Sequence, residues 1–188
     1  MPTLPGIKQF DLTGKTAIIT GGSKGLGLAM GAALASAGAN LMLVNRNAEQ
    51  GKLAAEQLSA DYGTRVVAFT ADVTNPSQIE AMAKAAFETF GRIDILINSA
   101  GINIRGAIDE LSPEDFNQVM NINVTGTWHA CKAVAPAMRK QGYGKVVNIS
   151  SNTIQLGNPN LLHYVVSKGA VATMTRCLAR ELGPLGAW

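Results

Sequence analysis

The chain has 188 residues, of which 47% are hydrophobic and 15% are charged, and its formal net charge is +3. A chain of this length suits one domain that buries about 70% of the surface exposed when unfolded. The few charges and the scattered apolar residues exclude a disordered chain and a coiled coil. We therefore expect one densely packed domain over residues 1–188.

The arrangement of charges and cysteines excludes several kinds of partner. Basic residues are spread singly, which argues against nucleic acid, and the longest stretch of low polarity, residues 26–44, is too interrupted to span a membrane. Cys131 and Cys177 lie far apart and have no metal-ligand spacing, and residues 1–15 contain no apolar signal-peptide core. These features predict a reduced, cytoplasmic protein without a metal site.

Short β-branched runs alternate with helical segments along the chain, which is the pattern of βαβ units around a parallel sheet. Nearly every position in the runs is apolar, as expected for strands that helices cover on both faces. The sequence therefore predicts a doubly wound α/β fold. Its five strands are expected at residues 16–20, 41–44, 66–70, 93–97 and 146–149.

The helix between the third and fourth strands has the clearest signals. Apolar residues recur at helical spacing over residues 79–90. Asn75 and Pro76 predict an N-cap and a first-turn proline, Gln78 a capping-box partner, and Gly91 a left-handed stop. Similar end signals predict three further helices, at residues 47–63, 112–139 and 160–183.

A glycine-rich loop, T-G-G-S-K-G-L-G over residues 20–27, joins the first strand to an alanine-rich helix. Glycine allows the sharp turn and lets a pyrophosphate approach the backbone N–H groups at the helix start. A tight turn with close helix–strand packing is the alternative. We expect a dinucleotide site, because βα units follow the loop. Its predicted contacts are Gly21, Ser23, Lys24, Gly25, Leu26 and Gly27.

The end of the second strand predicts which nicotinamide cofactor is preferred. An acidic residue there would bind the ribose 2′-hydroxyl of NAD, but this chain has Asn45 followed by Arg46. A neutral side chain removes repulsion of a 2′-phosphate, and Arg46 and Lys24 can pair with it. We therefore expect NADP(H) to be favoured over NAD(H). The alternative is that both basic residues are solvated surface charges.

These residues, together with motifs further along the chain, resemble the short-chain dehydrogenase/reductase family over essentially the whole sequence. The glycine loop resembles T-G-x-x-x-G-x-G, residues 98–101 resemble N-N-A-G with Ser99 in place of the second Asn, and residues 164–168 resemble Y-x-x-x-K. The resemblance implies a Rossmann-type sheet of order 3-2-1-4-5. It also adds cofactor contacts at Asp72, Val73, Asn98, Ala100 and Gly101, and at the catalytic Tyr164 and Lys168.

The spacing of Tyr164 and Lys168 supports acid/base chemistry. Residues i and i+4 share one face of a helix, and an ammonium near a phenol stabilises the phenolate. Tyr164 can then donate a proton to a ketone oxygen, and Ser151 can bind the same oxygen. By resemblance, Lys168 also holds the nicotinamide ribose and Asn123 orders a water. Each residue alone also fits a plain structural role.

The substrate is less determined by the sequence. A polar set of candidate pocket residues favours a hydroxylated or anionic small molecule, such as a sugar acid or polyol: Asn103, Arg105, Asn152, Gln155, Asn158 and His163. A reductase of 3-oxoacyl thioesters is an alternative, and a cofactor-binding module without catalysis is another. His129 and His163 are interpreted as structural or pocket-lining, and the two cysteines as buried thiols.

The family resemblance also implies a longer chain. Relatives continue through two further strands, so the 188 residues are expected to be a fragment whose fifth strand forms an exposed sheet edge, prone to aggregation. Residues 117–137 and 161–182 are expected to form the helix contact of a homodimer or homotetramer. The fragment alone is expected to be weakly active or inactive.

Overall fold

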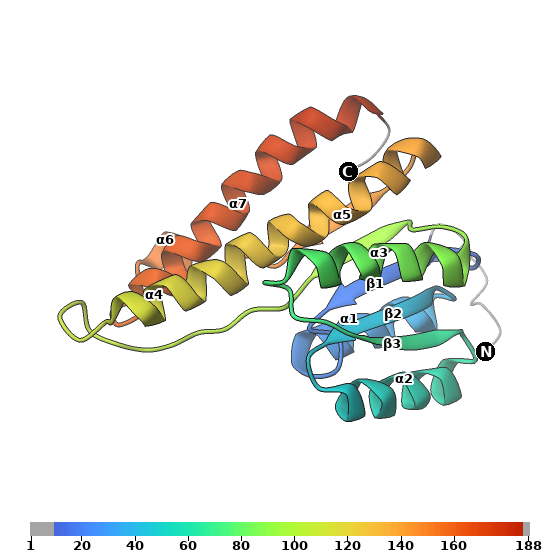
Figure 1. Ribbon diagram of the computed structural model, residues 1–188, viewed down its shortest axis with the longest axis horizontal. Coiled ribbons are helices and arrows are strands. Elements are labelled where there is room, and N and C mark those ends of the chain that lie inside the picture. Colours follow the sequence, from blue (N-terminus) through green and yellow to red (C-terminus); the bar gives the residue numbers. More distant parts are fainter. Residues whose placement is uncertain (1–9, 186–188) are drawn as a thin grey trace.

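A five-stranded parallel sheet lies at the centre of the computed structural model, which describes residues 10–185 (Figure 1). Within that part of the chain the strands lie side by side in the order β3-β2-β1-β4-β5. This order confirms the predicted Rossmann-type fold. The strands are β1 (Thr16–Thr20), β2 (Asn40–Asn45), β3 (Val66–Thr70), β4 (Ile95–Asn98) and β5 (Lys145–Asn148).

The fourth and fifth strands differ from their predicted bounds. The prediction placed Ile93 in a strand, but its backbone N–H and C=O both bond to the Gln141 side chain, at 3.0 and 2.9 Å. The ladder with β1 therefore begins only at Ile95. The fifth strand lies one residue earlier than predicted, at Lys145–Asn148, and forms an edge of the sheet as expected.

Helices cover both faces of the sheet because successive strand side chains point in opposite directions. On one face Ile18, Met42 and Leu96 pack with α3 and α5, and on the other Ile19 and Leu43 pack with α1 and α2. The helices are α1 (Gly25–Ser36), α2 (Ala48–Tyr62), α3 (Pro76–Phe90), α4 (Pro113–Met120), α5 (Gly126–Gln141), α6 (Thr153–Leu156) and α7 (Leu162–Leu182), followed by the 3₁₀ turn η3 (Gly183–Leu185).

The caps of α3 follow the sequence prediction except at Gln78. The Asn75 side chain accepts a hydrogen bond from the Gln78 N–H at 3.2 Å, and Gly91 ends the helix with φ of +77°. The Gln78 side chain, predicted to complete a capping box, instead accepts from the Asp72 N–H at 2.7 Å. Gln78 thereby holds the turn after β3, where Asp72 faces a cavity described below.

The helix predicted over residues 112–139 is interrupted. It forms α4, a π-helical turn η2 (Asn121–Thr125), and then α5, which continues past Pro136 to Gln141. Such π turns are frequent at functional sites. The last long helix begins at Leu162, because Asn160 adopts a left-handed conformation with φ of +60°.

No helix among residues 10–185 is long and apolar enough to cross a membrane.

Candidate active site

The glycine loop takes the close backbone path that the sequence predicts. Gly21 has φ of +67°, a conformation that favours glycine, and it hydrogen-bonds to the Val44 carbonyl at 2.8 Å. A Cβ on Gly27 would collide with the carbonyl of Gly21. No side chain caps the start of α1, so its first N–H groups can bind an anion.

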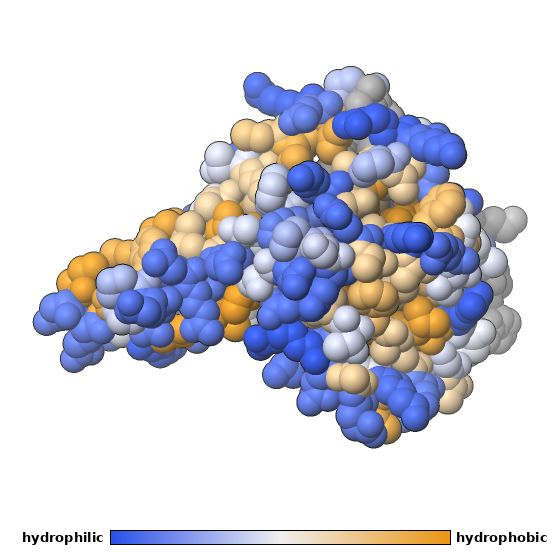
Figure 2. Space-filling model, in the orientation of Figure 1, coloured by the Kyte–Doolittle hydropathy of each residue, from blue (hydrophilic) through white to orange (hydrophobic). Residues whose placement is uncertain are grey.

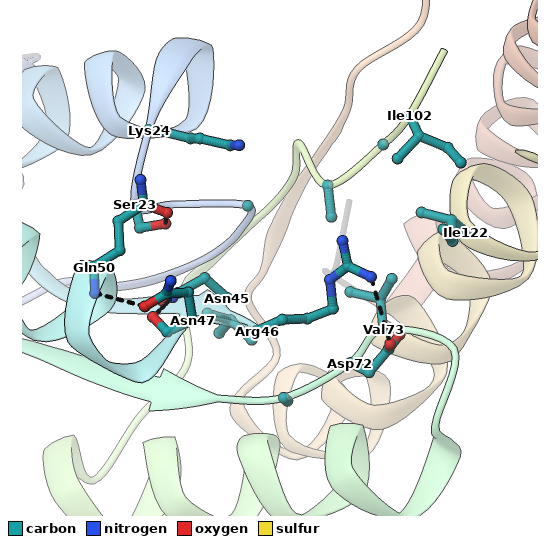
Figure 3. A pocket seen from close by; sticks show the side chains of 15 residues that line it. Ser23, Lys24, Asn45, Arg46, Asn47, Gln50, Asp72, Val73, Ile102 and Ile122 are labelled. Atoms are coloured by element: carbon teal, nitrogen blue, oxygen red, sulfur yellow. Dashed lines mark hydrogen bonds and ion pairs between the residues drawn. The ribbon is translucent and has the colours of Figure 1, made fainter. Parts of the chain in front are cut away.

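A cavity of about 340 Å³ lies in front of this loop, where the carboxyl ends of β1 to β4 meet (Figure 3). In an open parallel sheet, this is the place where a ligand binds. Nine predicted cofactor residues line it: Gly21, Ser23, Lys24, Asn45, Arg46, Asp72, Val73, Ala100 and Gly101.

Six predicted cofactor residues do not line the cavity, among them Tyr164 and Lys168 of α7, which are described below. Gly25, Leu26 and Gly27 belong to the loop and the first turn of α1, where the Leu26 side chain is 70% exposed, and Asn98 lies buried beneath the cavity. Six further residues line the cavity and were not predicted from the sequence: Val44, Asn47, Gln50, Ala71, Ile102 and Ile122. The position of Asn47 and Gln50 in the first turn after β2 was the available signal for two of them.

An ion pair forms part of the cavity wall. The guanidinium of Arg46 lies 4.0 Å from the carboxylate of Asp72, as the dashed line in Figure 3 shows. Burial alone would raise the pKa of Asp72, but hydrogen bonds from Thr74 and the charge of Arg46 hold it below its ordinary value. Lys24 is exposed and also lines the cavity. The cavity therefore offers two cations and one carboxylate to a ligand.

Asn45 is held by its own turn rather than pointing freely into the cavity. Its amide nitrogen donates to the carbonyl of Asn47, and Gly51 packs against its side chain so closely that a Cβ would collide. Beside it, the Ser23 hydroxyl donates to the Gln50 side chain at 3.2 Å. The end of β2 thus holds the Asn45 side chain in place and presents the exposed Arg46 as its charged group.

Tyr164 and Lys168 lie one turn apart on α7, as predicted. The Lys168 amine lies 5.7 Å from the centre of the Tyr164 ring and donates to the carbonyl of Ile149 at 2.7 Å. The ammonium was expected close to the phenol, but its hydrogen bond goes to the Ile149 carbonyl at the end of β5. Burial lowers the pKa of the Lys168 amine.

Asn123 lies in the π-helical turn and is only 1% exposed. Its Oδ1 accepts from the Ile102 N–H at 2.8 Å, and its Nδ2 donates to the Ile102 carbonyl and to Ser167 Oγ, both at 3.0 Å. A Cβ built on Gly101 would lie 3.1 Å from Asn123 Oδ1 and 3.6 Å from Lys168 Nζ. Both predicted polar residues therefore meet the wall of the cavity.

Ser151 follows β5 and keeps a donor for a ligand. Its Oγ accepts from the Thr153 N–H at 3.2 Å and from the Thr153 hydroxyl at 2.8 Å. Both bonds use lone pairs, so the Ser151 proton remains available to a substrate oxygen. Among the described residues, Ser151 and Tyr164 share no hydrogen bond.

A second polar cluster lies beneath the site. Asn98 Nδ2 donates to Asn148 Oδ1 at 2.8 Å and to Cys131 Sγ at 3.4 Å, joining β4, β5 and α5. Burial raises the pKa of the Cys131 thiol to about 12, so this thiol is an unreactive structural group. Cys177 is exposed, contrary to the expectation that both thiols are buried.

The two histidines differ in their surroundings. His129 bonds through Nδ1 to the carbonyl of Val73 at 2.9 Å, whereas His163 is fully buried and neither ring nitrogen has a partner in the described part of the chain. No group of three potential metal-ligating side chains is present in residues 10–185.

Comparison with known proteins identifies the family of the chain. The family model of short chain dehydrogenases matches residues 15–186. The chain belongs to the short-chain dehydrogenase family. It therefore carries an oxidoreductase fold that binds a nicotinamide cofactor, and the glycine loop and the cavity fit that group.

Three relatives of this family are informative. D-threitol dehydrogenase of Mycolicibacterium smegmatis is 37% identical over 178 residues, which are 95% of this chain and 68% of the relative. The 3-oxoacyl-[acyl-carrier-protein] reductase of Synechocystis is 34% identical, covering 93% of this chain and 71% of that one. The crystal structure of NAD⁺-bound xylitol dehydrogenase matches with a TM-score of 0.91 and 32% identity, over 94% of this chain and 68% of that one.

The chain spans about two thirds of the length of the curated relatives that it matches, with shares of 66–71%.

Proposed function

We propose that the protein is an NADP(H)-dependent oxidoreductase that interconverts a secondary alcohol and a ketone, with Tyr164 as the general acid/base. One observation carries the proposal. Lys168 Nζ and Asn123 Oδ1 approach Gly101, a residue of the cavity wall, from the helix and the π turn that stand beside Tyr164. This arrangement supports the proposal because Lys168, one helical turn from Tyr164, reaches the wall of the cofactor cavity.

The residues of the chain divide the chemistry among them. When bound, a nicotinamide cofactor exchanges a hydride with the substrate carbon. Tyr164 gives its hydroxyl proton to the ketone oxygen in one direction and recovers it in the other. Ser151 donates a hydrogen bond to the same oxygen and stabilises its developing charge. The buried Lys168 ammonium favours the phenolate of Tyr164, and Asn123 orders a water that returns protons to bulk solvent.

The preference for NADP(H) rests on Lys24, Asn45 and Arg46. A charge-assisted bond to the 2′-phosphate contributes about 1.5–3 kcal/mol, whereas the exposed Arg46–Asp72 pair that must open is worth about 0–1 kcal/mol. The net gain of about 0.5–3 kcal/mol corresponds to NADP(H) binding about two- to 150-fold more tightly than NAD(H). The xylitol dehydrogenase structure contains NAD⁺, which makes this the point most in need of measurement.

Calorimetric titration with NADPH and NADH tests the preference. Arg46→Asp should abolish or reverse the affinity ratio, and Arg176→Asp, an equal charge reversal at an exposed position of α7, should leave it unchanged. Equal affinities of the unmodified protein for both cofactors would contradict the proposal and leave Arg46 as a surface charge.

The proposed substrate is a small polyol or sugar acid. The polar residues that the sequence suggests for the substrate pocket, Asn103, Arg105, Asn152, Gln155 and Asn158, support it, as does the similarity to D-threitol dehydrogenase. The alternative, a 3-oxoacyl thioester, is supported by the similarity to the Synechocystis reductase. A panel of polyols, ketoses and acetoacetyl thioesters, assayed with NADP⁺ or NADPH, distinguishes them. Tight cofactor binding without turnover of any member would favour a non-catalytic cofactor-binding module.

We also propose that the protein forms a homodimer or homotetramer in the cytoplasm and has no nucleic-acid or membrane partner. Apolar side chains gather at the end of the molecule that holds α4 and α6 (Figure 2). Leu162 and Val166 of α7 are 44% and 45% exposed there and line a groove with Ile108. Contact between copies would cover them, and light scattering would measure the assembly.

A further inference from the structure

Ser167 is a fully buried hydroxyl between Tyr164 and Lys168 that the proposed mechanism does not use. We infer that Ser167 is a positioning residue, which fixes the Asn123 amide and thereby sets Tyr164 and Lys168 against the wall of the cofactor cavity. The inference rests on the proposed function, because it concerns how that site is held together.

The contacts of Ser167 join three elements. Its Oγ donates to the Tyr164 carbonyl at 2.7 Å and accepts from Asn123 Nδ2 at 3.0 Å. Asn123 in turn bonds to both the N–H and the C=O of Ile102, which lines the cavity after β4. A continuous chain of hydrogen bonds therefore runs from the helix of Tyr164, through the π turn, to the wall of the cavity.

The direction of each bond is determined by chemistry. Ser167 has one hydroxyl proton, and the Tyr164 carbonyl can only accept, so that proton is committed. The hydroxyl can then only accept from Asn123, which orients Nδ2 toward Ser167 and leaves Oδ1 for the Ile102 N–H. Removal of the hydroxyl takes away the one side-chain partner that this buried amide has among residues 10–185, although both bonds to Ile102 remain.

This linkage matters because hydride and proton transfer need precise alignment. A misplacement of about 1 Å can lower a rate roughly 10²-fold. Asn123 and Lys168 both approach Gly101, so rotation of the Asn123 amide would shift the cavity wall relative to Tyr164. The transition state would be affected more than cofactor binding, whose other contacts lie near β1 to β3.

Thr175 provides a matched control on the same helix. Its Oγ1 donates to the Val171 carbonyl at 2.7 Å and accepts from Asn148 Nδ2 at 2.9 Å, which repeats the two bonds of Ser167 two turns away. Ser167→Ala should lower kcat about ten- to a hundredfold with the Kd of NADPH unchanged, and Thr175→Val should leave kcat unchanged. Ser167→Cys, with a weak donor and acceptor, should restore part of kcat.

Two further readouts separate positioning from general stability. In an Asn123→Ala background, Ser167→Ala should lower kcat little further, because both changes remove one linkage. The side-chain amide protons of Asn123 should exchange with solvent at least about tenfold faster in Ser167→Ala than in Thr175→Val, since the amide loses one of its partners.

The outcomes distinguish this inference from the proposed function. Absence of turnover by the unmodified protein would contradict the function, and the amide exchange would still test the linkage. Unchanged exchange in Ser167→Ala would overturn the inference. Faster exchange with unchanged kcat in an active protein would overturn it as well, and so would an equal loss of kcat in Thr175→Val. If Ser167→Ala does not fold, the same comparison is made with Ser167→Cys.

Discussion

The two ends of the sheet use polar groups in opposite ways. At the amino end, the fully buried Asp94 receives two hydrogen bonds of 2.6 Å from Arg92 and one of 2.9 Å from the Thr16 N–H, and Lys15 lies 3.6 Å away. At the carboxyl end, the first turn of α1 lacks a side-chain cap, and Ser151 retains a free donor.

This difference indicates that the amino end of the sheet serves stability and the carboxyl end serves ligand binding. Charges that are satisfied within the protein hold the amino ends of β1 and β4 together. Polar groups at the carboxyl end are only partly satisfied, so that they can bind a ligand. We therefore expect changes at the amino end to affect unfolding and changes at the carboxyl end to affect cofactor binding or turnover.

The largest effect on stability is expected for Asp94→Asn. The amide keeps an acceptor for the Thr16 N–H but loses the charge that pairs with Arg92 and Lys15, so the free energy of unfolding should fall by about 3 kcal/mol. Urea denaturation measures it, with Glu88→Gln, which breaks an exposed pair with Lys84, as a control that changes less than about 0.5 kcal/mol. A similar small change for Asp94→Asn would contradict this role.

Acid should weaken the same end of the sheet. Burial opposes ionisation of Asp94, but the Arg92 hydrogen bonds, the Thr16 amide and the nearby cations together hold its pKa below the ordinary value. Its stabilisation is therefore fully present above the unfolded pKa of about 3.9 and is lost as pH falls through the folded pKa. The unfolding free energy of Asp94→Asn should decline less steeply below about pH 4 than that of the unmodified protein. Parallel curves would refute this.

At the carboxyl end, Gly27→Ala should reduce cofactor binding. The added Cβ would collide with the Gly21 carbonyl and lie 2.8 Å from its carbon, so the loop must move. This displacement costs a free energy of about 1–3 kcal/mol. The Kd of NADPH should rise about five- to a hundredfold. Gly169→Ala on α7 meets no atom within 4 Å and should leave the Kd unchanged. An unchanged Kd in Gly27→Ala would show that the close approach is unimportant.

The smallest effect concerns the two histidines. His163→Leu removes two buried ring nitrogens without partners among the described residues, so the unfolding free energy should rise by about 1 kcal/mol. His129→Leu removes the bond to the Val73 carbonyl and should lower the unfolding free energy by a similar amount. Thermal unfolding compares the two, and destabilisation by His163→Leu would show that its ring is bonded in solution.

The sequence predicted the features that depend on local chemistry. Asn75 and Gly91 bound α3 because each end is determined by a few neighbouring residues. The glycine loop was predicted for the same reason, since Gly21 and Gly27 have no substitute at that turn. The strand order required the family resemblance, because local patterns do not determine which strands are neighbours.

The missed features depend on contacts between distant residues. The π turn interrupts a helix whose local pattern is continuous, and its Asn123 bonds to Ile102 and Ser167, 21 and 44 residues away. The Gln78 side chain bonds to the Asp72 N–H and does not form the predicted capping box. Asp94, just before β4, pairs with Lys15, just before β1. Spacing along the chain predicts residue types for a site, but these partners become visible only in the folded chain.

The most direct test of the account is the turnover of Tyr164→Phe at saturating NADPH with a ketose that the unmodified protein reduces. The substitution removes only the phenolic hydroxyl. We expect kcat to fall at least about 10²-fold, with the Kd of NADPH and the unfolding free energy unchanged. Turnover equal to that of the unmodified protein would contradict the assignment of Tyr164 as the proton donor, and with it the proposed mechanism.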